Sequence, residues 1–206
     1  MGLKANADGS GAIQVGGSDA ITITSGLNTT FAGTASVATG TLYPLVSGTV
    51  NNGGTNPFPS SGGPTLVDFT SIPSWVKRIT VMFNGVSTSG TSLKQIQLGA
   101  GAITTSGYSG GYGGGGAAAW NGGTISSGVA LGNSALAADT LSGIMLITNV
   151  TANTWTMSYS GGSSSGNFAQ IAGGAIALSG TLDRVRITTV NGTDTFDAGS
   201  INILYE

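Results

Sequence analysis

Three aspartates near the C-terminal end are the residues whose type and spacing come closest to a reaction site. Asp183, Asp194 and Asp197 flank a predicted strand and hairpin, where they could meet. Glycosidic cleavage needs two carboxylates about 5–10 Å apart on a rigid frame. A structural role fits better, because Asp183 starts a strand beside Arg184 and Asp194 belongs to an Asn-Gly-Thr-Asp turn. We therefore predict that the chain is not an enzyme, with a polysaccharide-degrading enzyme as the less favoured alternative.

Composition excludes most other chemistry. The chain has no histidine and no cysteine, which removes Ser-His-Asp and Cys-His catalysis and cysteine-containing zinc sites. Its acids lack the spacing of an EF-hand loop, and six basic residues cannot form a wide track for nucleic acid. Arg184 and Arg186 share one strand face, where a solvated position or an ion pair to Asp or to Glu206 is the expected role. We predict no metal, no cofactor, no nucleic-acid partner and, because apolar runs are short, no membrane insertion.

The most unusual stretch of the chain is residues 105–123, which read TSGYSGGYGGGGAAAWNGG. A phosphate-binding loop needs a following helix and usually a lysine, and neither is present. We predict a long loop at the rim of the fold. Aromatic rings offer a large contact area at low side-chain entropy, so Tyr108, Tyr112 and Trp120 are the candidate partner-binding residues. The alternative is that these rings pack back on the sandwich or on a neighbouring subunit.

Elements with a period of two residues must position these side chains. Only 7% of the residues are charged while 39% are hydrophobic, which favours a folded all-β protein with a Thr/Ser surface. Strands are predicted at 12–15, 20–24, 29–32, 35–38, 65–70, 75–83, 92–98, 140–148, 153–159, 168–178, 182–190 and 200–205. Many short strands at regular spacing indicate a β-sandwich of jelly-roll-like topology.

The pattern divides the chain into three parts. Residues 1–46 form a short β-segment with few large side chains, which needs a partner to order it. Its predicted trimer and virion contacts are Ile13, Val15, Ile21, Ile23 and Phe31. Residues 47–64 contain paired glycines and three prolines and are predicted to be a linker. Residues 65–206 form the sandwich head, with a core predicted to include Trp75, Ile79, Val81, Phe83, Ile96, Leu146, Trp155, Ile187, Ile201 and Ile203.

Three segments carry a family resemblance. They are ANADGSGAIQVGGSDAITI at 5–23, FTSIPSWVKRITVMFNGVSTSGTS at 69–92 and SGTLDRVRITTVNGTDTFDAGSINILYE at 179–206. They resemble tail-fibre and related virion surface proteins of tailed bacteriophages, of the marine phage type. The first is similar to a short β-repeat of such proteins, and the other two to the start and end of their C-terminal β-sandwich. Residues 99–140 carry no such likeness.

The resemblance implies a structural, non-enzymatic homotrimer on a virus particle, assembled in the cytoplasm of the bacterial host. It implies contacts with other virion proteins through the N-terminal segment. The expected function is that of a short tail fibre or adhesin whose partner is a host cell-surface glycan or protein. Because at most about 50 residues precede the linker, a capsid decoration protein or head fibre remains the alternative.

Overall fold

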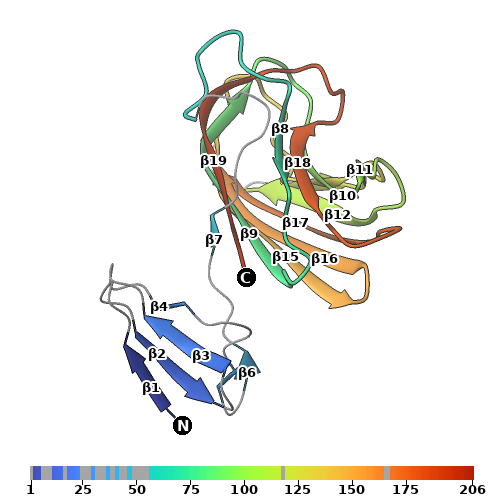
Figure 1. Ribbon diagram of the computed structural model, residues 1–206. Coiled ribbons are helices and arrows are strands. Elements are labelled where there is room, and N and C mark those ends of the chain that lie inside the picture. The colour runs from blue at the N-terminus through green and yellow to red at the C-terminus, as the bar shows by residue number, and fades with distance from the viewer. Residues whose placement is uncertain are drawn as a thin grey trace. The chain divides into compact units, whose positions relative to one another are not determined.

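The computed structural model describes residues 56–116, 119–164 and 168–206 in full, together with the backbone of seven short strands between residues 2 and 47 (Figure 1). Every regular element in this part of the chain is a β-strand, which confirms the all-β prediction. Among the same residues no helix is long and apolar enough to cross a membrane. The chain divides into two compact units, Met1–Pro44 and Leu45–Glu206.

The first unit contains a small antiparallel sheet. Its strands follow the chain order, β1 (Gly2–Ala5), β2 (Gly11–Val15), β3 (Ser18–Ile23) and β4 (Thr29–Thr30). Ile13 lies opposite Ile21 in the β2–β3 register. A separate two-stranded ladder joins β5 (Ser36–Val37) to β6 (Gly40–Thr41). The two alternating apolar runs of this segment therefore pair with each other, as strands with a period of two residues do.

The second unit consists of two antiparallel sheets. The larger has the order β13–β12–β17–β16–β15–β9–β19–β7 and the smaller β11–β10–β18–β8, with β14 also pairing β10. The large-sheet strands are β7 (Val46–Ser47), β9 (Arg78–Thr88), β12 (Ser109–Gly115), β13 (Trp120–Gly123), β15 (Leu141–Thr151), β16 (Thr154–Ser163), β17 (Phe168–Ala177) and β19 (Phe196–Tyr205). The small-sheet strands are β8 (Leu66–Thr70), β10 (Lys94–Ala100), β11 (Ala102–Ile103), β14 (Val129–Ala130) and β18 (Arg184–Thr189).

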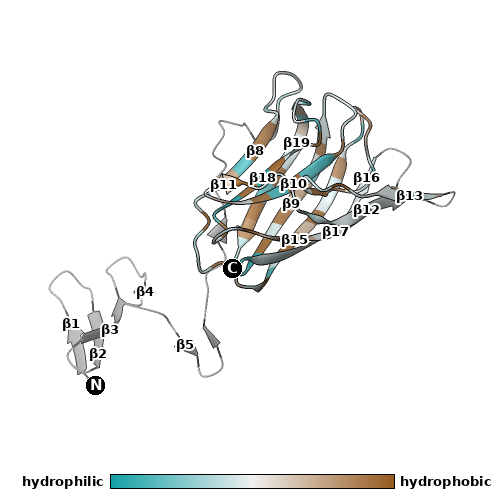
Figure 2. Ribbon diagram, turned by 90° about the vertical axis from the view of Figure 1, so that its right-hand side faces the viewer, coloured by the Kyte–Doolittle hydropathy of each residue, from teal (hydrophilic) through white to brown (hydrophobic). Residues whose placement is uncertain are grey.

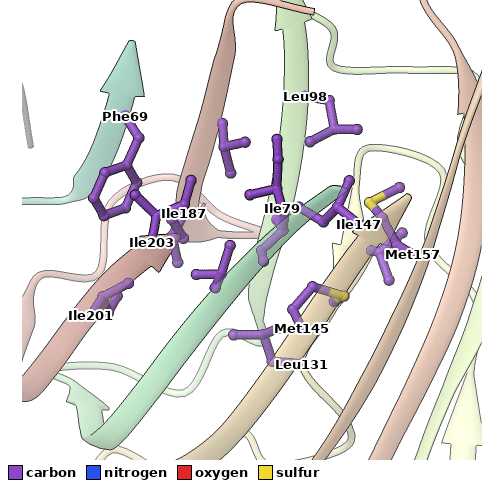
Figure 3. Close-up of a cluster of buried hydrophobic side chains, with 14 of the residues drawn as sticks. Phe69, Ile79, Leu98, Leu131, Met145, Ile147, Met157, Ile187, Ile201 and Ile203 are labelled. Carbon is purple, nitrogen blue, oxygen red and sulfur yellow. The ribbon is translucent and has the colours of Figure 1, made fainter. Parts of the chain in front are cut away.

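One hydrophobic core lies between the two sheets. Figure 3 shows Phe69, Leu98 and Ile187 of the small sheet meeting residues of the large sheet in one cluster. Period-two alternation places alternate side chains of each strand there, and Figure 2 shows the apolar residues along the strands of both sheets. Eight of the ten predicted core residues are buried: Ile79, Val81, Phe83, Ile96, Trp155, Ile187, Ile201 and Ile203. This layout is that of a β-sandwich.

Two of the ten predicted core residues are not fully buried in the structure. Leu146 is 38% exposed on the outer face of the large sheet, so its assignment to the core is wrong. It belongs to an uninterrupted apolar run, 144–147, in which alternation cannot choose the inward side, and Met145 and Ile147 are the buried members. Trp75 is half-buried and packs beside Tyr205, with ring centroids 6.1 Å apart.

The glycine-rich stretch is not the predicted rim loop. Residues Ser109–Gly115 form β12, which pairs with β17 over seven positions, and Trp120–Gly123 form the edge strand β13. Glycine is a poor strand former in isolation. Here its missing side chain permits the pairing, because a Cβ at Gly110 would collide with the backbone of Gly173 on β17. Tertiary contact therefore overrides the local preference.

Part of the predicted linker packs against the sandwich. The Phe58 side chain is buried, and its ring stacks on that of Phe196 with centroids 5.2 Å apart. The Phe58 backbone nitrogen donates to the carbonyl of Gly199 at 2.8 Å, and the Asn56 amide donates to the carbonyl of Ile201 at 3.0 Å. Residues 56–64 are therefore attached to β19, while residues 48–55 lie outside the described part of the chain.

Candidate functional site

The three candidate carboxylates do not form one site. The Asp183 backbone nitrogen bonds to Gly99 near the end of β10, whereas the Asp194 carboxylate accepts from the backbone nitrogen of Ser92, just before β10 begins. Seven residues of extended chain separate these two anchors, which is roughly 23 Å. This exceeds the separation that either mechanism of glycosidic cleavage uses. Asp183 and Asp194 therefore cannot act as a pair.

Each of these acids also has a structural partner. Asp183 forms two hydrogen bonds with the Arg184 guanidinium, at 2.8 and 3.0 Å, which lowers the pKa of the Asp183 carboxyl. Asp194 accepts from the Asn191 amide at 2.7 Å inside the predicted turn. Asp197 accepts a hydrogen bond from the Ser87 hydroxyl. The structural roles predicted for Asp183 and Asp194 are confirmed.

The predicted ion pairs of the two arginines are confirmed as well. Arg186 binds Asp68 on the neighbouring strand β8 through both carboxylate oxygens, each at 2.7 Å. Arg184 binds Asp183, as described above. The Arg186 pair joins β18 to β8 through two charge-assisted hydrogen bonds, whereas the partner of Arg184 is its neighbour in sequence. Across the described residues, no cluster of three or more His, Cys, Asp or Glu side chains could hold a metal ion.

Tyr108 belongs to the core. Its side chain is only 5% exposed, and its phenol oxygen accepts from the Leu98 backbone nitrogen at 2.6 Å. The phenol donates to the Thr104 carbonyl at 3.0 Å. Burial raises the pKa of Tyr108 to about 12, although the Leu98 hydrogen bond opposes part of that rise. The ring is thus not at a surface where a partner could contact it.

The other two rings of the glycine-rich stretch lie further out. Tyr112 is half-buried and packs against the core, and its hydroxyl occupies the space that a side chain at Gly123 would need. Trp120 is 57% exposed on the edge strand β13, opposite Gly115 of β12. Of the three candidate partner-binding residues, Trp120 alone presents most of its ring to solvent.

The sheet that carries Trp120 has an outer face that is almost free of charge. Residues opposite each other in an antiparallel sheet share a face, and one row runs from Met82 through Ile144, Ser160 and Ile171 to Gly113. Ile144 and Ile171 are 51% and 52% exposed. The next rows add Leu146 and, at the edge, Trp120. On these described strands Arg78, paired with Glu206, is the single charged residue of this face and lies at its end.

A shallow groove of about 550 Å³ crosses this outer face, and we call it the outer groove. It runs over β12, β17 and β16, where the glycines leave a depression beside the Ile171 side chain. Its lining includes Gly111, Gly113, Ser158, Ser160, Ile171 and Gly173. One feature of the sequence indicates this outer face. The period of two residues in 168–178 places Ala169 and Ile171 on the side of the strand opposite Gln170 and Ala172.

The predicted trimer and virion contacts lie in the first unit. Ile13 and Val15 are on β2, and Ile21 and Ile23 are on β3. Their side chains, and the whole of Phe31, lie outside the described part of the structure. Comparisons with protein-family models, with curated proteins and with solved structures find no match for this chain.

Proposed function

We propose that this chain is a non-enzymatic structural protein of a tailed-phage particle, and that its sandwich attaches to the host surface as a short tail fibre or adhesin. The nearly uncharged outer face of the large sheet carries this proposal. It leaves Ile144, Leu146 and Ile171 exposed, and Trp120 is exposed on the edge strand of the same sheet. Several large apolar side chains exposed on one face are typical of interaction sites, because monomeric proteins keep exposed apolar patches small. The partner is a neutral region of a host cell-surface protein or glycan.

The chemistry of the described residues supports binding over catalysis. The two acids at opposite ends of β10 are too far apart to cooperate, and each has a hydrogen-bond partner within the fold. A flat neutral groove suits a broad contact, in which apolar area and excluded water supply the affinity. The resemblance of the three sequence segments to virion surface proteins supports the phage assignment.

The remaining parts of the proposal concern assembly. The chain forms a homotrimer in the virion, and the N-terminal unit contacts identical chains and other virion proteins. Its sandwich has the jelly-roll-like topology of related heads. A capsid decoration protein or head fibre is the alternative location, and the outer face would then contact the capsid. Electron cryomicroscopy of the particle distinguishes the two by the position of the sandwich.

A paired substitution tests the attachment surface. Virions carrying Ile144→Ser and Ile171→Ser should adsorb to the host several times more slowly, because the apolar contact area of the outer face is lost. The melting temperature should hold, since both side chains are more than half exposed. Val190→Ser is the matched control, because Val190 is 42% exposed and follows β18 of the other sheet. Equal adsorption rates for the paired variant and the control would refute attachment through this face.

A further inference from the structure

A second cavity lies where β12 ends and β17 begins, and we call it the end pocket. It is a pocket of about 180 Å³ between the ends of β12 and β17 and the segment 131–140. Its lining includes Gly114, Asn133, Ser134, Asp139, Phe168 and Gln170. Gln170 and Phe168 alternate with the outward-facing Ala169 and Ile171, so the end pocket and the outer groove lie on opposite sides of β17.

The glycines of the sequence build this pocket around the amide of Gln170. A Cβ at Gly114 or at Gly132 would collide with the Gln170 side chain, and Gly132 also has a φ of +84°. The Gln170 oxygen accepts from the Asn133 backbone nitrogen at 2.6 Å, and its nitrogen donates to the Ser163 hydroxyl at 3.3 Å. Gln170 is 2% exposed, so its amide is held in one orientation.

A carboxylate forms another wall. Asp139 is 2% exposed and accepts hydrogen bonds from the hydroxyls of Ser134 and Ser164, the second at 3.2 Å. Lys94 is buried close by, with an ammonium nitrogen that has no hydrogen-bond partner among the described residues. Burial lowers the pKa of Lys94, and the negative charge of Asp139 opposes that effect. Lys94 does not line the pocket, whereas Asp139 does.

The lining selects a class of ligand. Among the described residues that line it there is no Lys or Arg and Asp139 is the one charged residue, so the pocket does not favour a phosphate, sulfate or carboxylate group. Fixed amide and carboxylate oxygens accept from hydroxyl groups, and the amides of Asn133 and Gln170 donate to them. Phe168 is 41% exposed and offers an aromatic ring at the side of the cavity. The volume is below the ~300 Å³ of sites for drug-sized ligands, which limits the occupant to about one ring.

We propose that the end pocket binds one ring of a neutral saccharide, with the sugar hydroxyls on Asp139, Asn133 and Gln170 and the ring beside Phe168. Each sugar hydroxyl can donate a hydrogen bond to an oxygen of the lining and accept one from an amide nitrogen. The apolar face of a pyranose can pack against an aromatic ring. The assignment rests on the proposed host attachment for its biological role alone, since sugar binding by the isolated protein does not depend on a virion.

Saturation-transfer NMR of the full-length protein with free glucose, galactose, mannose and N-acetylglucosamine tests the assignment. At least one sugar should show saturable binding. Asn133→Ala should weaken it by about threefold to tenfold, the effect of losing one uncharged hydrogen bond. Phe168→Ser should weaken it as well, and Val190→Ser, after β18 of the other sheet, should leave it unchanged. Melting temperatures confirm that the variants are folded.

Two outcomes would overturn the end pocket as a sugar site. One is the absence of saturable binding for all four sugars. The other is binding that Ile171→Ser weakens while Asn133→Ala and Phe168→Ser do not. Competition by calcium or methylammonium for the same pocket would also contradict a neutral ligand. If Asn133→Ala weakens sugar binding while virions that carry it adsorb normally, the end pocket is a sugar site that host attachment does not use, and the attachment proposal is then judged by the Ile144→Ser and Ile171→Ser variant alone.

Discussion

The phenol oxygen of Tyr108 accepts a hydrogen bond from the backbone nitrogen of Leu98 at 2.6 Å, in the interior of the sandwich. This bond fixes the start of the glycine-rich hairpin to the small sheet, because Leu98 belongs to β10. The same stretch exposes Trp120 at its other end. A single glycine-rich segment thus has a structural aromatic residue and an exposed one, with different consequences on substitution.

Replacing Tyr108 by Phe should lower the free energy of unfolding by about 1–3 kcal/mol, because the buried Leu98 nitrogen loses its acceptor. Denaturant unfolding followed by tryptophan fluorescence measures the change. Trp120→Ser should leave that free energy within about 0.5 kcal/mol, as expected for an exposed site. A fall in adsorption rate with Tyr108→Phe, at unchanged stability, would show that the phenol binds a partner after all.

Phe83→Ala should cost about 3–5 kcal/mol of unfolding free energy, since it removes a buried ring from the core. Phe83 is 4% exposed and packs edge-on against the Tyr159 ring, with centroids 6.0 Å apart. Leu146→Ala on the neighbouring strand β15 is the control and should cost less than about 1 kcal/mol, because Leu146 faces outward. Equal losses for the two variants would mean that the facing of these strands is wrong.

Stability should fall in strong base. Burial raises the pKa of Tyr108 and Tyr159 from 10.0 to about 12, so the folded state holds these protons more tightly than the unfolded state. The contribution is therefore fully present below pH 10 and is lost as the pH rises through 12, by about 2–3 kcal/mol for each tyrosine. Unfolding curves at a series of pH values measure the loss. A free energy of unfolding that stays constant over this range would contradict the burial of both phenols.

The Tyr159→Phe variant separates the contributions of the two phenols to the pH dependence of the unfolding free energy. The Tyr159 hydroxyl is buried without a hydrogen-bond partner in the described part of the chain, so its removal should cost little at neutral pH. The variant should then lose roughly half as much stability as the parent above pH 10. A large loss at neutral pH would indicate a bound water at this hydroxyl.

The N-terminal unit should hold the trimer together. Ile13 and Ile21 lie opposite each other in the register of β2 and β3, so Ile13→Ser with Ile21→Ser changes one position of the sheet on both strands. Analytical ultracentrifugation of the full chain should show a trimer, and the paired variant should dissociate at higher concentration than the parent. A parent chain that sediments as a folded monomer would exclude this assembly.

The sequence predicted the strands whose side chains alternate clearly. On β9, buried Ile79, Val81 and Phe83 alternate with more exposed residues, and the predicted facing is confirmed. A period of two residues cannot identify the buried side where consecutive residues are all apolar, as around Leu146. It also cannot identify a strand that consists mostly of glycine, such as β12. The end pocket could not be predicted from the sequence. Gln170 and Asp139 are 31 positions apart, and only the folding of the chain brings them into the same lining. Tyr108 was misjudged because its acceptor role depends on a backbone group of another strand.

The glycines of the edge hairpin also determine which of its positions are free to vary. At Gly110, Gly115 and Gly122 the backbone of a paired segment occupies the place where a Cβ would stand, so a side chain there is sterically excluded. Trp120 and Asn121 are exposed, and their replacement disturbs no packed neighbour of this kind. Related chains that keep this hairpin should therefore diversify at these two open positions while the glycines stay constant. Substitutions at Trp120 and Asn121 can therefore change the surface of the edge strand while the strand pairing that holds it stays the same.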